Sequence, residues 1–186
     1  MLSKVLCNEV SLVSIDPGIN HLGLCVSKLS LPNHKFVHSE ATSFHAKERY
    51  LNKDTIEKFS MSQAKIDYMS QNVLSVLYKE NPITVIAESP FYNHLRPAAF
   101  MPLVELLYQL KQSVRIFHNV NFVTYPPSII KKAVGASAVC KKDEVKKYVN
   151  KLKDIMHLSS DWDSLDEHAI DALAVMYTHV QKVFKQ

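Results

Sequence analysis

Three acidic residues stand where their carboxylates could share one site. Asp16 closes an apolar run and Glu88 closes a short β-branched run, so each would lie at the end of a strand. Asp171 comes three residues after His168 in a segment with helical spacing, which places both side chains on one helical face. Sites in open α/β sheets form at the carboxyl ends of strands. We therefore expect the three carboxylates to converge there.

Converging carboxylates favour a divalent metal ion, because they repel one another unless a cation lies between them. Oxygen ligands of this kind suit Mg²⁺ or Mn²⁺. Two such ions about 4 Å apart can activate a water and stabilise the leaving oxygen when a phosphodiester is hydrolysed. We therefore expect two Mg²⁺ or Mn²⁺ ions per site and a hydrolytic reaction on a phosphodiester.

Two glycines follow Asp16 closely. Gly18 can form a tight turn, and Gly23 lets a neighbouring backbone or side chain approach. Simpler interpretations of the acidic residues stay open, because those at the strand ends can belong to turns. The pair in the helical segment can be a polar patch on a helix surface.

Positive charge is concentrated in one segment. Residues 131–153 contain eight lysines and two acidic residues, a local charge of +6 in a chain whose net charge is +4. The rest of the chain is therefore slightly acidic, and the basic segment favours a surface that binds a polyanion. A solvated lysine-rich helix is the alternative.

Length and composition indicate one globular domain inside the cell. The chain has 186 residues, of which 47% are hydrophobic and 22% are charged. No apolar run approaches the roughly 20 residues that a membrane helix needs, and residues 1–15 lack a signal-peptide core. The three cysteines are widely spaced, so neither disulfides nor a zinc site is expected, and a cytoplasmic location fits.

Residue periodicity predicts an α/β layered domain with a mixed sheet of about five strands flanked by helices. Strands are expected over residues 10–15, 21–29, 35–41, 83–87 and 121–125. Residues 42–59 are expected to be a loop. Helices are expected over residues 61–81, 97–117 and 142–156, with a short helix before the last of these and a closing helix at the end. No repeat or domain boundary is visible, so residues 1–186 should form one domain.

The start of the closing helix is predicted from a capping box. Ser164 would be the N-cap, and Glu167 would occupy the third helical position. Since capping accounts for Glu167, we leave it out of the site. The histidines other than His168 are scattered, and we interpret them as structural or exposed.

Four segments resemble the motifs of the RuvC family of Holliday-junction resolvases, in the family's order and across nearly the whole chain. Residues 14–18 with Gly23 are similar to the first acidic motif, and residues 87–91 to the second. Residues 125–132 with Lys142 are similar to the basic segment, and residues 168–174 to the terminal motif. The resemblance implies an RNase H-like fold and a dimer that nicks two opposing strands of a four-way DNA junction.

The resemblance also implies roles for individual residues. The family's catalytic and metal-binding positions, the third of which is histidine or aspartate, correspond to Asp16, Glu88, His168 and Asp171. Phe91 falls where the family has an aromatic residue near the crossover, with core packing as the alternative. Lys131 and Lys142 fall on the family's DNA-contacting lysines, and the basic segment adds Lys132, Lys141 and Lys146 to the lysines expected to contact DNA.

Two departures from the family pattern limit what carries over. Leu22 replaces a small hydroxyl residue, which changes little. Residues 135–140 lack a glycine-rich character, so no cleavage-sequence preference is implied. The divergent segment and the low glycine content favour a phage-encoded protein, acting in a bacterial or phage-infected host cell. The sequence identifies no branch-migration partner.

Three other functions fit parts of the sequence. The spacing from Asp16 to Gly23 also matches the D-x-G-x₄-G turn of actin–hexokinase phosphotransferases, but those proteins need two domains and this chain is too short. A nuclease of the same fold could cut flapped or otherwise branched DNA. A DNA-structure binder that does not cleave is disfavoured by the intact acidic residues.

Overall fold

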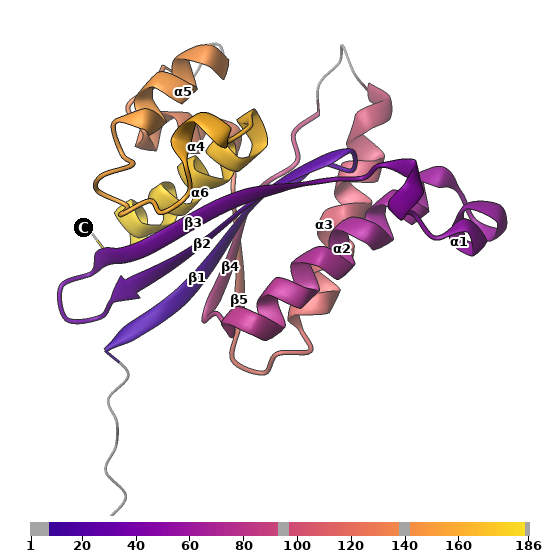
Figure 1. Cartoon of the computed structure of the whole chain (residues 1–186), viewed down its shortest axis with the longest axis horizontal. Coiled ribbons are helices and arrows are strands. Elements are labelled where there is room, and N and C mark those ends of the chain that lie inside the picture. The colour runs from indigo at the N-terminus through magenta and orange to yellow at the C-terminus, as the bar shows by residue number, and fades with distance from the viewer. Residues whose placement is uncertain (1–7, 93–96, 138–141, 185–186) are drawn as a thin grey trace, which may run out of the picture.

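A five-stranded mixed sheet forms the centre of the computed structural model, which describes residues 8–92, 97–137 and 142–184 (Figure 1). The strand order is β3-β2-β1-β4-β5. β1 pairs antiparallel with β2, and β2 with β3, whereas β1, β4 and β5 run parallel. The strands are β1 Glu9–Asp16, β2 His21–Ser30, β3 Lys35–His45, β4 Thr84–Glu88 and β5 Asn121–Tyr125. The expected α/β class and five-stranded mixed sheet are confirmed.

Helices cover both faces of this sheet (Figure 1). One face carries α2 (Met61–Glu80) and α3 (Phe100–Val114), and α1 (Lys53–Lys58) contacts α2. The other face carries the three helices α4 (Pro127–Ala133), α5 (Lys142–Asn150) and α6 (Glu167–Phe184). Short 3₁₀ turns are η1 Glu48–Tyr50, η2 Pro97–Ala99 and η3 Trp162–Ser164.

Alternation along the strands divides the core into two layers, because successive side chains of a strand point to opposite faces. On β1, Val13 and Ile15 pack with residues of α2 and α3. Leu12, one residue earlier than Val13, packs instead with residues of α6. All three side chains are fully buried. The face to which any β1 residue points can therefore be read from its position in this alternation.

The structure corrects three expected boundaries. The prediction of a loop over residues 42–59 was wrong, since β3 continues to His45 and is followed by η1 and α1. Pairing with β2 along its whole length sustains this polar part of β3. The expected helix over residues 97–117 divides into η2 and α3. The helix expected to reach residue 156 ends at Asn150, and turns follow that keep Leu152 and Met156 buried.

Cys25 is a structural thiol. It lies fully buried on β2 without a disulfide, and burial raises its pKa to about 12 despite a hydrogen bond with Ser27. Cys7 and Cys140 lie outside the described residues. Within the described ranges, none of the helices has both the length and the apolar character needed to cross a membrane.

Candidate active site

Asp16 and Glu88 end two neighbouring parallel strands. Ile15 pairs with Ala87 in the register of β1 and β4, so the next residue of each strand lies at the same carboxyl edge. Ile15 and Ala87 both pack towards α2 and α3. Because side chains alternate along a strand, Asp16 and Glu88 point to the opposite face, which α6 covers. Two of the predicted acidic residues thus start from adjacent positions on one face.

The N-terminal part of α6 lies directly against this edge. Ser14 Oγ donates a buried 2.7 Å hydrogen bond to the carbonyl oxygen of Ala172. A Cβ atom on Gly23, the register partner of Asp16, would lie 1.8 Å from the carbonyl oxygen of His168. The close approach that the sequence suggested for Gly23 is therefore confirmed, and the backbone of α6 is what approaches.

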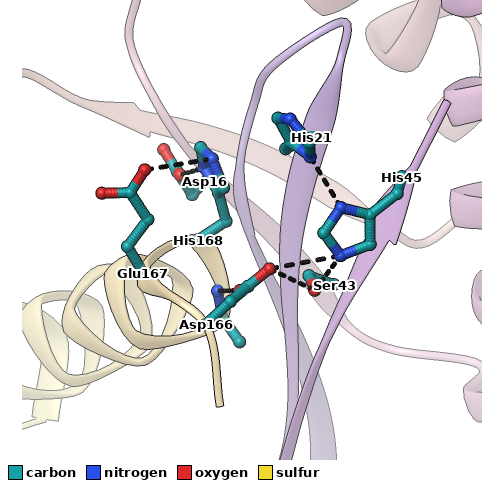
Figure 2. A network of polar contacts seen from close by, with 8 residues as sticks. Asp16, His21, Ser43, His45, Asp166, Glu167 and His168 are labelled. Atoms are coloured by element: carbon teal, nitrogen blue, oxygen red, sulfur yellow. Dashed lines mark hydrogen bonds and ion pairs between the residues drawn. The ribbon is translucent and has the colours of Figure 1, made fainter.

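Asp16 and His168 are in direct contact (Figure 2). His168 Nδ1 lies 2.8 Å from Asp16 Oδ2, and the side chains are 21% and 14% exposed, respectively. An ionised carboxylate only accepts hydrogen bonds, so Nδ1 carries a proton, and whenever the ring is neutral its lone pair is on Nε2. A carboxylate partner of this kind fixes the ring orientation and tautomer of many metal-binding histidines.

The donor types at this edge fit a divalent cation. Glu88 and Asp171 are half-buried and belong to β4 and α6, the elements that flank Asp16. Three carboxylates and one imidazole are ligands that Mg²⁺ or Mn²⁺ accepts. Among the described residues, no group of three His, Cys, Asp or Glu side chains is arranged to hold a metal ion. In the structure β1, β4 and α6 lie together, and Asp16 contacts His168. The binding of metal by all four residues stays a prediction.

Asp166, rather than Ser164, caps α6. Asp166 Oδ1 accepts a 2.9 Å hydrogen bond from the backbone N–H of Ala169, the third residue of the helix. Ser164 ends the preceding 3₁₀ turn, where its hydroxyl donates to the carbonyl oxygen of Asp161. The capping-box prediction was wrong because Asp166 also accepts a 2.7 Å hydrogen bond from Ser43 on β3, a tertiary contact that fixes it at the helix start.

The acidic residues beside His168 contribute to the local electrostatics. Burial alone would raise the pKa of Asp166, but its hydrogen bonds with Ala169 and Ser43, aided by nearby histidines, outweigh burial and lower the pKa. Asp166 therefore stays ionised at neutral pH. Glu167, which sequence reasoning left out, has Oε1 3.6 Å from His168 Nε2 and so stands at the border of the site.

Two further histidines belong to this network and were missed from the sequence (Figure 2). His21 and His45 are register partners on β2 and β3, and their Nδ1 atoms lie 2.6 Å apart. His21 also stacks on His168, with ring centroids 5.4 Å apart and planes inclined by 15°. Burial, followed by repulsion from the other two rings, lowers the pKa of His21. The pairing could have been found only if β3 had been extended to residue 45.

The predicted DNA-contacting residues lie partly within the described chain. Phe91 is 58% exposed just after β4, so packing in the core is excluded as its role. Lys132 on α4 and Lys146 on α5 are exposed, and Lys131 is half-buried. Lys142 begins α5, but its side chain, like the whole of Lys141, lies outside the described residues.

Sequence comparison relates the chain to RuvC proteins over almost its whole length. It is 26% identical over 177 residues to the crossover junction endodeoxyribonuclease RuvC of a Nitratiruptor species, covering 94% of this chain and 98% of that relative. No protein-family profile matches the sequence.

Comparison of structures gives the same relation. Thermus thermophilus RuvC superposes with a TM-score of 0.67 at 22% identity, covering 92% of this chain and 95% of that structure. T. thermophilus RuvC in complex with a Holliday junction substrate superposes with a TM-score of 0.66 at 22% identity, covering 93% and 94%. The RNase H-like fold expected from the sequence is therefore confirmed.

Proposed function

We propose that this chain, which is RuvC-like in sequence and in fold, is a crossover junction endodeoxyribonuclease. It would resolve four-way DNA junctions by hydrolysing one phosphodiester bond in each of two opposing strands. The observation that carries the proposal is the similarity to a protein of that name over 94% of the chain. The contact of Asp16 with His168 at the carboxyl end of β1 adds a polar site on which the chemistry can be centred.

The catalytic and metal-binding residues in this proposal are Asp16, Glu88, His168 and Asp171. Their oxygen-rich donor set fits Mg²⁺ or Mn²⁺, and a pair of ions would suit phosphodiester hydrolysis. A bound divalent ion lowers the pKa of water and stabilises charge on the leaving oxygen.

The protein's own contribution is to hold these side chains in place. The Asp16 carboxylate orients the His168 ring and leaves Nε2 as the acceptor nitrogen. Ser14 and Gly23 fix the distance of α6 from the sheet. Asp166 satisfies an N–H group at the start of the helix, so the turn that carries His168 is well defined.

The DNA-binding part of the proposal rests on charge and exposure. T. thermophilus RuvC has been solved with a Holliday junction substrate, and the present chain shares its fold. We assign branched DNA as the substrate here, with phosphate contacts from the basic segment and stacking by the exposed Phe91. Paired nicks require two sites, so we propose a homodimer of one nuclease domain spanning residues 1–186. It would act in the cytoplasm of a bacterial or phage-infected cell.

Cleavage of synthetic DNA tests the function. The protein would be incubated with Mg²⁺ and a four-way junction, a flap or a linear duplex, each labelled on every strand in turn. Symmetric nicks in the junction alone are expected. Equal cutting of the flap would turn the proposal towards a general branched-DNA nuclease, and binding without cutting would refute the enzyme.

Charge-removing variants test the site. Asp16→Asn, Glu88→Gln and Asp171→Asn should each bind the junction but cut it at less than about a tenth of the wild-type rate, because metal catalysis is abolished while phosphate contacts persist. Glu105→Gln, an exposed position on α3, is the matched control. A variant that cuts faster than this limit removes its residue from the site.

A further inference from the structure

His21, His45, Ser43 and Asp166 are joined by a series of hydrogen bonds. The proton on each histidine can be placed by starting from Asp166. Asp166 Oδ2 accepts from Ser43 Oγ at 2.7 Å, which uses the only hydroxyl proton of Ser43. His45 Nε2 lies 3.1 Å from Ser43 Oγ and 3.3 Å from Asp166 Oδ2. Both oxygens can only accept from this nitrogen, so Nε2 of His45 carries a proton.

The proton position on His45 sets the tautomer of His21. A neutral His45 that is protonated on Nε2 has a bare Nδ1, which must accept at the 2.6 Å contact. His21 therefore donates from Nδ1, and its neutral ring has the lone pair on Nε2. The contact fixes both the rotation and the tautomer of the His21 ring, although that ring lies near the surface.

The His168 ring stacks on the ring of His21. The two rings are nearly parallel, with an interplanar angle of 15° and centroids 5.4 Å apart. Both line a pocket of about 590 Å³ beside the end of β1, together with Glu167. His168 is thus held by Asp16 through a hydrogen bond and by His21 through ring stacking (Figure 2).

The Asp166 carboxylate links these histidines to the start of α6. Asp166 Oδ1 caps α6, the helix that carries His168, while Oδ2 anchors Ser43 and His45 on β3. Asp166 therefore connects the start of the helix that carries His168 with His45, the hydrogen-bond partner of His21. Several constraints on one ring are what a site needs to hold a functional group within a fraction of an ångström.

We propose that His21 is a positioning residue of the active site, which, backed by His45 and Asp166, holds the His168 imidazole in the orientation that Asp16 requires. The part of this inference that concerns cleavage rests on the proposed nuclease function. The part that concerns the His168 ring does not.

Substitutions of His21 distinguish a role in positioning the His168 ring from a role of the His21 nitrogen atoms in the reaction. His21→Phe keeps a flat ring for stacking but has no nitrogen, whereas His21→Ala removes the ring. His45→Ala leaves His21 in place without its acceptor. His118→Ala, an exposed histidine between α3 and β5, is the matched control.

The first measurement is the tautomer of His168 from long-range ¹H–¹⁵N correlations of its ring, made at one fixed pH on free protein. The wild type, the control and His21→Phe should show the Nδ1–H form. His21→Ala should show averaging with the Nε2–H form, and His45→Ala should show the same for His21. An unchanged His168 spectrum in His21→Ala would overturn the inference.

The second measurement is single-turnover cleavage of a four-way junction at saturating protein. His21→Ala should be slowed about tenfold or more, with unchanged junction affinity, because small misplacements of a catalytic group are costly in rate. His21→Phe should recover most of the rate. If Phe is as slow as Ala while its His168 spectrum is wild-type, His21 acts through its own nitrogen and the positioning role is refuted. Failure of the wild type to cut would refute the nuclease function and leave the spectra to judge the positioning.

Discussion

Gly23→Ala adds a single methyl group, which should move His168 on α6 away from Asp16 on β1. The added Cβ would lie 1.8 Å from the carbonyl oxygen of His168, 2.3 Å from its carbonyl carbon and 3.0 Å from Ala169 N. All three are backbone atoms, so no side chain can rotate out of the way. Either the start of α6 or the start of β2 must move.

The size of the movement follows from these distances. Ordinary contact for a Cβ atom begins at 3.4 Å, so the carbonyl of His168 must retreat by 3.4 − 1.8 = 1.6 Å. A shift of that size along the 2.8 Å bond between Asp16 and His168 would open it to about 4.4 Å, well beyond hydrogen-bond range. Overpacking of this kind costs about 1–3 kcal/mol of stability, which an ordinary domain survives.

The expected result is a folded protein that binds DNA but scarcely cuts it. Displacing a catalytic group by about 1 Å can reduce a rate about 100-fold, whereas the lysines proposed to contact phosphates lie on α4 and α5, away from Gly23. Single-turnover cleavage, junction affinity and thermal melting would be compared with Ser30→Ala, a control at the other end of β2. A Gly23→Ala protein with wild-type cleavage and melting would show that α6 can move without disturbing the site, and our reasoning about its placement would fail.

Three other perturbations have defined outcomes. Phe91→Ala should slow junction cleavage by removing stacking worth about 1–3 kcal/mol, yet leave the melting temperature unchanged because Phe91 is exposed; a large loss of stability would contradict this. Lys132→Ala with Lys146→Ala should flatten the dependence of log affinity on log salt by nearly one unit for each phosphate that is no longer neutralised, and an unchanged slope would assign these lysines to solvent. Burial lowers the pKa of His179 from its usual 6.5, so below that pH the unfolded chain binds more protons and the free energy of unfolding falls. His179→Gln should weaken this acid-dependent loss between about pH 7 and pH 5 in denaturant titrations, and an unaltered pH dependence would exclude His179 as its source.

The strands that carry the acidic residues could be predicted because their signals are local. The apolar runs before Asp16 and Glu88 end where β1 and β4 end, and a glycine seven residues after Asp16 pointed to a close approach. The helix start could not be placed as well, since Ser164 and Asp166 are both good capping residues. A contact with Ser43, more than a hundred positions away in the chain, decides between them.

The histidine network was hidden for a similar reason. His21 and His45 meet through the antiparallel register of β2 and β3, and the polar composition beyond residue 41 gave no sign that β3 continues. Side-chain alternation shows which face a residue occupies only if the strand is known to extend to that residue. The positions of the four predicted ligands could therefore be related to the sheet, while the contacts of His21 and His45 near His168 could not.

Because the chain is synthesised from its N-terminus, the residues of β1 are made long before those of α6 that complete the site. Asp16 and His168 are 152 positions apart, and Ser14 and Ala172 are 158 apart. A ribosome-bound chain could pair β1 with β2 and β3 early, but it would lack the partner of Asp16 and one wall of the core until α6 had emerged. Contacts of such long sequence separation also form late and slowly in folding. The proposed nuclease activity is therefore expected to arise only after α6 has been made, and chains that lack α6 should not cut DNA.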